Sequence, residues 1–205
     1  MIGFFPFSMF TKKISSISLL QNKIRACTLC APYLPHGVRP VFQIHSQARI
    51  LVAGQAPGRK VHASGLPFDD ASGDRLRDWM GIPREVFYDA KQVAIVPMGF
   101  CYPGTGKSGD LPPRSECANA WRSRIMAQLP QIQLTLAIGQ YALAYHIPKT
   151  GQSLTEVVKQ WKTYWPSLLP MPHPSPRNNI WLSKNLWFEK DVVPSLRKLV
   201  SQVLK

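Results

Sequence analysis

Hydrophobic residues in this chain fall into short, nearly unbroken runs, separated by segments with a helical repeat. Apolar runs with little alternation are typical of strands buried on both faces of a sheet. Between two such runs, Leu76, Trp79 and Met80 recur at helical spacing. Strands alternating with helices predict an α/β fold, a parallel sheet with helices on both faces. The expected strands span residues 48–53, 93–98, 134–138 and 168–171. The expected helices span residues 15–25, 73–80, 115–129, 140–146, 154–161 and 181–204. The last of these is interrupted near Pro194, which we place in the first turn of a second helix.

The chain length suits one domain with a sizeable core, since 205 residues bury most of their apolar surface in a single fold. We interpret residues 1–24 as an N-terminal extension, partly irregular, and residues 25–205 as the single domain. Residues 1–10 are apolar but lack the basic start and cleavage site of a signal peptide. No apolar run is long enough to cross a membrane, so we expect a cytoplasmic protein without membrane contact.

The charge balance is strongly basic. Lys and Arg number 25 against 11 Asp and Glu, giving a formal net charge of +14. Such an excess favours a polyanionic partner, most simply nucleic acid, over a merely solvated basic surface. We therefore expect association with the nucleoid, and we take the protein to be a monomer.

Two turns, each following an expected strand, carry the candidate chemistry. Residues 54–58 (Gly-Gln-Ala-Pro-Gly) follow the first strand, and residues 173–177 (His-Pro-Ser-Pro-Arg) follow the last. In open α/β sheets, ligands bind at the carboxyl ends of the strands. The first turn carries little that can ionise, whereas the second offers an imidazole, a hydroxyl and a guanidinium. Together they predict a pocket for a flat polar ligand beside a phosphate chain.

Four cysteines form a second constellation. Cys27 and Cys30 make a C-x-x-C, and Cys101 and Cys117 lie sixteen positions apart. Structural disulfides are unusual in cytosolic proteins. Four thiolates can close a tetrahedral zinc site or hold an iron–sulfur cluster. We favour such a metal centre over buried apolar cysteines, and also over a redox pair, because the C-x-x-C precedes the first strand.

Five motifs in order give the chain a family resemblance. They are the C-x-x-C, the Gly54–Gly58 turn, Gly65-Leu66-Pro67-Phe68, the Cys101/Cys117 pair and His173-Pro174-Ser175. Over about residues 25–200 the chain resembles the uracil-DNA glycosylase superfamily, in particular its iron–sulfur family 4 branch. The resemblance implies a three-layer α/β/α sandwich with a central four-stranded parallel sheet. It also implies a structural 4Fe-4S cluster held by Cys27, Cys30, Cys101 and Cys117.

The resemblance further implies roles for the residues of the two turns. Phe68 would stack on a base flipped out of DNA, and His173 would donate a hydrogen bond to its O2 atom. An enzyme that acts on a base must extract it from the stack. One donor aimed at the charge developing on the leaving base contributes roughly 3–4 kcal/mol. Arg177 would contact phosphate or fill the gap left by the base. The catalytic candidates are His173 and Gln55, and the substrate-binding candidates are Gly54, Ala56, Pro57, Gly58, Phe68, Met98, Gly99, Pro174, Ser175 and Arg177.

Gln55 is the first departure from the family pattern, because family 4 usually has Glu at this position. A carboxylate helps to position or activate the attacking water, whereas an amide orients a water but cannot act as a base. We consider Asp69, Asp70 and His62 as substitutes.

The second departure concerns recognition of the base. The family has an Asn shortly before the third cysteine, and Pro97 lies near that position here. Backbone groups around Met98 and Gly99 are the candidate replacement, and hypoxanthine or xanthine joins uracil as a candidate base. The loop over residues 103–114 lacks the His that a related branch uses to trap DNA, so no crosslinking is expected.

The sequence thus predicts a DNA glycosylase that hydrolyses the N-glycosidic bond of uracil or another deaminated base and so initiates base excision repair. The alternative is a non-catalytic or weakly active iron–sulfur module of the same fold that binds nucleic acid.

Overall fold

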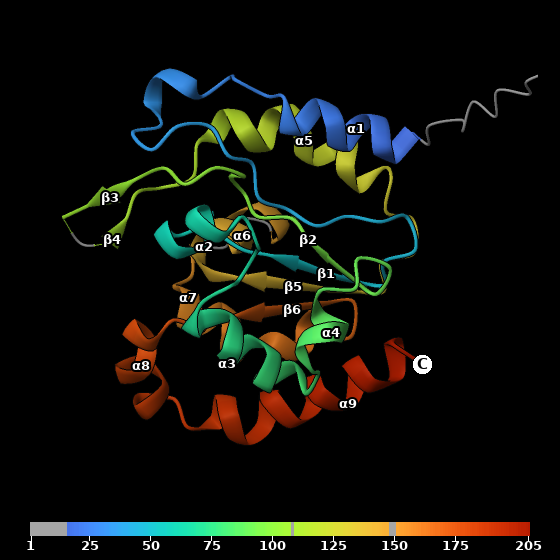
Figure 1. Cartoon of the computed structure of the whole chain (residues 1–205). Helices are drawn as coiled ribbons and strands as arrows, with labels where there is room; N and C mark the ends of the chain where they lie inside the picture. Colours follow the sequence, from blue (N-terminus) through green and yellow to red (C-terminus); the bar gives the residue numbers. More distant parts are fainter. Residues whose placement is uncertain (1–15, 108, 148–150) are drawn as a thin grey trace, which may run out of the picture.

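A four-stranded parallel sheet forms the middle layer of the computed structural model, which describes residues 16–107, 109–147 and 151–205. The strand order is β2-β1-β5-β6, and a two-stranded antiparallel hairpin, β3-β4, lies apart from the sheet (Figure 1). The strands are β1 Ile50–Ala53, β2 Val93–Ile95, β3 Thr105–Gly106, β4 Gly109–Asp110, β5 Leu134–Ile138 and β6 Leu168–Met171.

Helices cover both faces of this sheet, as Figure 1 shows with α1 and α5 on one side and α3 and α9 on the other. The α-helices are α1 Ser16–Arg25, α2 Arg59–Ser64, α3 Ala71–Met80, α4 Arg84–Phe87, α5 Ser115–Met126, α6 Gly139–His146, α7 Leu154–Lys159, α8 Asn179–Lys184 and α9 Val193–Val203. Shorter turns are the 3-10 helices Ala31–Tyr33, Trp161–Thr163 and Pro176–Asn178 and the π-helix Phe188–Val192.

The two cores follow from the alternation of side chains along β1. Ile50 and Val52 join the cluster that contains α3 and α9, whereas Leu51 packs with α1 and α5. Ala53 lies on the same face as Leu51 and packs against α6. Both faces of the strand are therefore buried, which explains why its sequence shows no polar alternation. The predicted α/β/α sandwich with a four-stranded parallel sheet is confirmed.

Most predicted elements are present, with differences at their ends. β5 and β6 have the predicted bounds, and Pro194 lies in the first turn of α9. β2 ends at Ile95, earlier than predicted, although the N–H groups of Val96 and Met98 still donate to the carbonyls of Val52 and Gly54. Pro170 is tolerated in β6 because this strand is at the edge of the sheet.

Among the α-helices and strands, α2, α4 and the β3-β4 hairpin were not predicted. The proposed extension over residues 1–24 lies largely outside the described residues, but its last part is in α1, where Ile17, Leu20 and Ile24 are buried. Among the described residues, no helix is long and apolar enough to span a membrane.

Candidate active site

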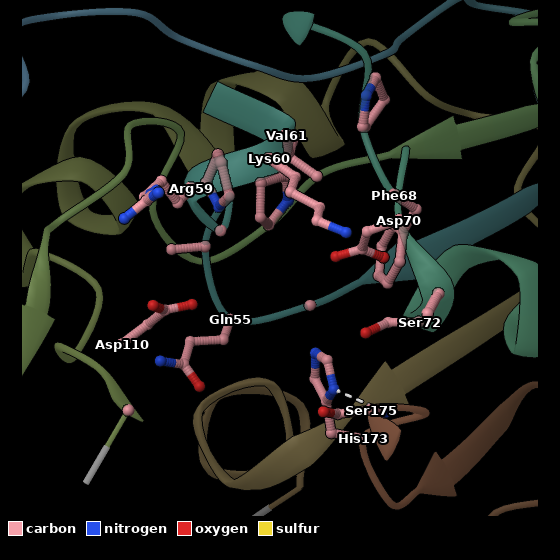
Figure 2. Close-up of a pocket in the computed structure, with 18 of the residues that line it drawn as sticks. Gln55, Arg59, Lys60, Val61, Phe68, Asp70, Ser72, Asp110, His173 and Ser175 are labelled. Atoms are coloured by element: carbon pink, nitrogen blue, oxygen red, sulfur yellow. Dashed lines mark hydrogen bonds between the residues drawn. The ribbon is translucent and has the colours of Figure 1, made fainter. Parts of the chain in front are cut away.

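A cavity of about 530 Å³ opens where β1 and β6 end, as the position of the two turns predicts (Figure 2). Its walls come from the turn after β1, the Phe68 loop, the β3-β4 hairpin and the turn after β6. The sequence-predicted residues that line it are Gly54, Gln55, Ala56, Pro57, Gly58, Phe68, His173, Ser175 and Arg177. Pro174 is buried within its turn, and neither it nor Met98 or Gly99 is among the lining residues.

His173 presents one ring nitrogen to this cavity (Figure 2). Its Nδ1 accepts a hydrogen bond from the Ser175 N–H at 3.2 Å, and its carbonyl accepts one from Asn178 Nδ2 at 2.7 Å. Burial lowers the pKa of His173, although Asp70 and Asp110 act in the opposite direction. The ring is therefore neutral at physiological pH, and because Nδ1 is an acceptor, the proton lies on Nε2. His173 is thus a fixed neutral donor.

The His173 turn is held from outside by Arg75 of α3. Its guanidinium donates to the Ser175 carbonyl at 3.2 Å and to Asn179 Oδ1 at 2.9 Å. Within the turn, Ser175 Oγ accepts from the Arg177 N–H at 3.2 Å. Ser175 is therefore partly occupied in shaping the turn. The Arg177 side chain reaches the hairpin, where a Cβ on Gly109 would meet its Nη1 at 2.8 Å.

Phe68 faces the cavity in a backbone conformation that side chains rarely adopt, with φ of 55°. Two glycines allow this placement. A Cβ on Gly54 would lie 3.4 Å from the Phe68 ring, and a Cβ on Gly73 would lie only 1.8 Å from the Phe68 carbonyl oxygen. The ring also packs edge-on against Phe87. The close approach of the backbone at Gly54 to the Phe68 ring fixes this ring as a cavity wall on which a flat ligand can stack.

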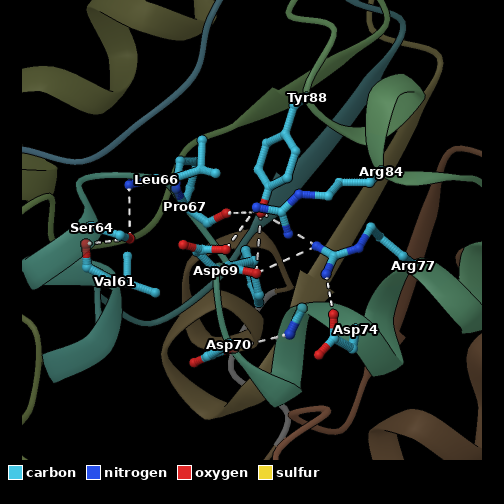
Figure 3. A network of polar contacts seen from close by, with 12 residues as sticks. Val61, Ser64, Leu66, Pro67, Asp69, Asp70, Asp74, Arg77, Arg84 and Tyr88 are labelled. Carbon is cyan, nitrogen blue, oxygen red and sulfur yellow. Dashed lines mark hydrogen bonds and ion pairs between the residues drawn. The ribbon is translucent and has the colours of Figure 1, made fainter.

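A polar network behind the Phe68 loop holds this strained conformation (Figure 3). The Phe68 carbonyl accepts hydrogen bonds from Arg77 at 3.4 Å and from the Tyr88 hydroxyl at 3.3 Å. Burial raises the pKa of Tyr88, so its hydroxyl stays protonated as a donor. Asp69 pairs with Arg84 at 2.8 Å. The loop is thus anchored on both sides of Phe68.

Gln55 is also positioned by neighbouring backbone. Its Nε2 donates to the Leu111 carbonyl at 3.2 Å, which leaves Oε1 as an acceptor. The Met98 and Gly99 N–H groups donate to the carbonyls of Gly54 and Gln55, at 2.9 and 3.0 Å. These two amides therefore support the turn, and their hydrogens are already engaged.

The three considered substitutes for the family's glutamate lie in different places. Asp69 faces Arg84 and does not line the cavity. Asp70 lines it, but its Oδ1 caps α3 by accepting from the Gly73 N–H at 3.0 Å. His62 is not among the lining residues, and its buried Nδ1 has no hydrogen bond among the described residues.

Several lining residues escaped the sequence reasoning. Arg59 and Lys60 follow Gly58 and make the rim basic. Ser72 lies on α3 with its side chain toward His173, and Asp110 lies opposite on the hairpin (Figure 2). Pro97, which the sequence places near the position of the family's base-reading Asn, also lines the cavity. The other lining residues that were not predicted are Ile95, Val41, Val61, Ala71, Gly109, Pro176 and Asn178. The basic pair was visible in the sequence as Arg59-Lys60 directly after the first turn, whereas Asp110 had no signal beyond its Gly-rich loop.

A second, smaller cavity is lined by all four cysteines, together with apolar residues such as Ile24 and Phe100. Each sulfur has a donor beside it. Trp121 Nε1 donates to Cys27 Sγ and the Phe100 N–H to Cys117 Sγ, both at 3.3 Å. The Arg114 side chain hydrogen-bonds Cys30, and the Arg39 backbone hydrogen-bonds Cys101. Donors aimed at sulfur stabilise thiolate ligands.

The four thiols line one cavity, which is compatible with a cluster in which each thiolate binds a separate iron. Among the described residues, no three His, Cys, Asp or Glu side chains are grouped closely enough to hold a single metal ion. Burial raises the pKa of Cys117 to about 12 and raises the pKa of Cys30 and Cys101.

The fold and the site together define a class: an α/β protein with a basic-rimmed pocket for a flat ligand and a cavity lined by four thiols. A sequence model of the uracil DNA glycosylase superfamily matches residues 41–197. The chain belongs to this superfamily, as its motifs predicted.

Two relatives resemble the chain at low identity. It is 22% identical over 150 residues to a "Type-4 uracil-DNA glycosylase" of Sulfurisphaera tokodaii, covering 71% of this chain and 64% of the relative. It is 23% identical over 152 residues to a protein of the same description from Thermotoga maritima, covering 73% and 74%. The chain thus spans somewhat less than two thirds of the first relative's length. The predicted likeness to the type-4 branch is confirmed.

Proposed function

We propose that this protein is a monofunctional DNA glycosylase that hydrolyses the N-glycosidic bond of uracil or another deaminated base and initiates base excision repair. One observation carries the proposal: a neutral His173 donor and the exposed face of Phe68 line the same cavity. A flat base with a carbonyl at its edge satisfies both at once.

The chemistry assigned to each group follows from the bond that breaks. Cleavage leaves an oxocarbenium-like sugar and negative charge on the base. His173 Nε2–H donates to the base oxygen on which that charge develops, and burial strengthens this interaction. Phe68 stacks on the face of the extruded base. Gln55, anchored through Nε2, orients a water through Oε1.

The rim of the cavity suits the phosphate chain on either side of a flipped nucleotide. Arg59, Lys60 and Arg177 all line it, and the whole chain carries a formal charge of +14. Contacts between such cations and phosphates supply affinity without sequence preference. The DNA substrate proposed here is therefore supported by the rim as well as by the pocket.

The four cysteines are proposed to hold a 4Fe-4S cluster with a structural role. The four thiols around one cavity and the donors beside their sulfur atoms support this proposal. When bound, the cluster would tie the loop before the sheet to α5 and to the segment after β2.

Anaerobic purification tests the cluster directly. Brown protein containing iron and acid-labile sulfide is the expected result. Cys27→Ser should lower both iron content and thermal stability, because ligation and folding are coupled. Colourless protein containing stoichiometric zinc would contradict the cluster.

A panel of oligonucleotides tests the activity. Single- and double-stranded DNA containing uracil, hypoxanthine or xanthine is incubated with the protein, and abasic sites are cleaved with alkali. Strand cleavage is expected with at least one of these bases. His173→Ala should abolish this cleavage, whereas His45→Ala should not, because His45 lies outside the cavity. No cleavage with any substrate would overturn the proposal.

The second candidate is a module of the same fold that binds nucleic acid without cutting it. Gln55 in place of a carboxylate and Pro97 in place of an asparagine favour it. Tight, salt-dependent DNA binding that is unchanged in His173→Ala, with no base release, is the result that would select this candidate.

A further inference from the structure

The proposed hydrolysis needs a group that accepts the proton of the attacking water, and Gln55 cannot accept it. We propose that Asp110, on the β3-β4 hairpin, is this group and replaces the missing carboxylate of the first turn. The inference rests on the proposed glycosylase function. It identifies a catalytic residue that lies far along the chain from both turns.

The hairpin delivers Asp110 to the wall of the first turn. Asp110 pairs with Thr105 in the antiparallel ladder, and the Leu111 N–H donates to the Gly104 carbonyl at 2.8 Å. The carbonyl of Leu111, the next residue, accepts the hydrogen bond from Gln55 Nε2. Backbone geometry therefore places the amide and the carboxylate beside each other, as Figure 2 shows.

The carboxylate also lies against the glycine that ends the first turn. A Cβ on Gly58 would meet Asp110 Oδ2 at 3.3 Å, a tight contact. Asp110 lines the cavity and is close enough to His173 to act on its ionisation electrostatically. A water held between Gln55 Oε1 and Asp110 would therefore lie in the same cavity as the base-binding imidazole.

Asp110 is the carboxylate left available for this task. Asp70 caps α3 and Asp69 pairs with Arg84. In the part of the chain that the structure describes, the Asp110 side chain makes no hydrogen bond or ion pair, and it is exposed to solvent at the rim. An unengaged acceptor beside a positioned amide is what a bound water requires.

The proposed step is balanced. The water oxygen forms a bond to the sugar C1′ as the N-glycosidic bond breaks, and the electron pair of that bond goes to the base. The base leaves as an anion that His173 Nε2–H stabilises. The water proton passes to Asp110, and the product is an abasic site with a hydroxyl at C1′.

Four proteins test the inference: wild type, Asp110→Asn, the Asp110→Asn/Gln55→Glu double variant, and Asp191→Asn. Asp191 is an exposed aspartate of the Phe188–Val192 turn, outside the cavity, and controls for the loss of one negative charge. Single-turnover base release is measured on the best substrate of the panel, with DNA binding measured alongside.

Asp110→Asn should slow base release about 100-fold without weakening DNA binding. Gln55→Glu in that background should restore much of the rate, because a carboxylate then faces the same water from the first turn. Asp191→Asn should match wild type. If Asp110 had only a structural role, a carboxylate at position 55 would not restore the rate.

Two failures are distinguishable. If wild type releases a base and Asp110→Asn does so at the same rate, the inference is wrong and the glycosylase proposal stands. The same holds if the double variant is no faster than Asp110→Asn. If wild type releases no base from any substrate, the proposed function fails and the inference fails with it.

Discussion

Replacing Gly73 by alanine tests whether the Phe68 loop controls the site. The new Cβ would lie 1.8 Å from the Phe68 carbonyl oxygen. Nonbonded carbon and oxygen need about 3 Å, so the loop and α3 must separate by roughly 1.2 Å. That carbonyl accepts the hydrogen bonds from Arg77 and Tyr88. The substitution therefore disturbs the hydrogen bonds that hold Phe68 in its positive-φ conformation.

Opposing effects set the size of the change in stability. Alanine favours the helix over glycine by about 1 kcal/mol. Against this, overpacking costs about 1–3 kcal/mol and each weakened hydrogen bond about 1 kcal/mol. A net loss of about 3 kcal/mol is expected, which lowers Tm by about 6–12 °C in a chain of this size. Base release should fall about 100-fold, because an ångström of misplacement at the stacking wall has that effect.

Gly37→Ala is the matched control for Gly73→Ala. Gly37 has φ of 81° and open space around it, so alanine there meets backbone strain of about 1 kcal/mol but no overlap. Differential scanning calorimetry and single-turnover kinetics are run on both variants. Gly37→Ala should lose stability and keep its rate. The reasoning is refuted if Gly73→Ala is as stable and as fast as wild type.

Three further measurements follow from the charged and titratable groups. Burial, with help from Arg122, lowers the pKa of His146 from 6.5 to about 4. As pH falls, the unfolded chain therefore binds a proton at this histidine before the folded chain does, and about 3 kcal/mol of stability should be lost between pH 7 and pH 4. Urea titrations of His146→Gln should show a weaker dependence of the unfolding free energy on pH, and an unchanged dependence would contradict the reasoning. Because the pKa of His173 is also lowered, mainly by burial, base release should be constant above pH 6.5 and fall only as acid protonates Nδ1; a rate that rises on acidification through pH 6.5 would contradict a neutral donor. Arg177→Ala should weaken DNA binding and reduce the slope of log K against log salt by about 1, and an unaltered slope would remove Arg177 from the phosphate contacts.

The sheet was predictable because its signal is local. Runs such as 134–138 are apolar throughout, and burial on both faces is the physical reason. The hairpin was not predictable, since Thr105–Gly106 and Gly109–Asp110 are two-residue strands without apolar alternation. The short α2 helix, Arg59–Ser64, buries only Val61 and so leaves no periodic trace.

The site was predictable to the extent that it lies at strand ends. Gln55 and His173 follow buried strands and meet in one cavity as expected. Met98 and Gly99 do not line it, because their amides are used to hold the first turn, a pairing that depends on how β2 lies beside β1. Asp110 could not be found because a hairpin packed across the cavity leaves no pattern in sequence.

One stretch of backbone connects the pocket and the cysteine cavity. In the segment after β2, the Met98 N–H donates to the Gly54 carbonyl, and two residues later the Phe100 N–H donates to Cys117 Sγ. The next residue is Cys101, so a group bound by the thiols would restrain the segment that holds the first turn. The cysteines need not touch DNA to affect catalysis, because loosening this segment moves the carbonyls of Gly54 and Gln55. The proposed cluster and the geometry of the pocket would then depend on the same packing.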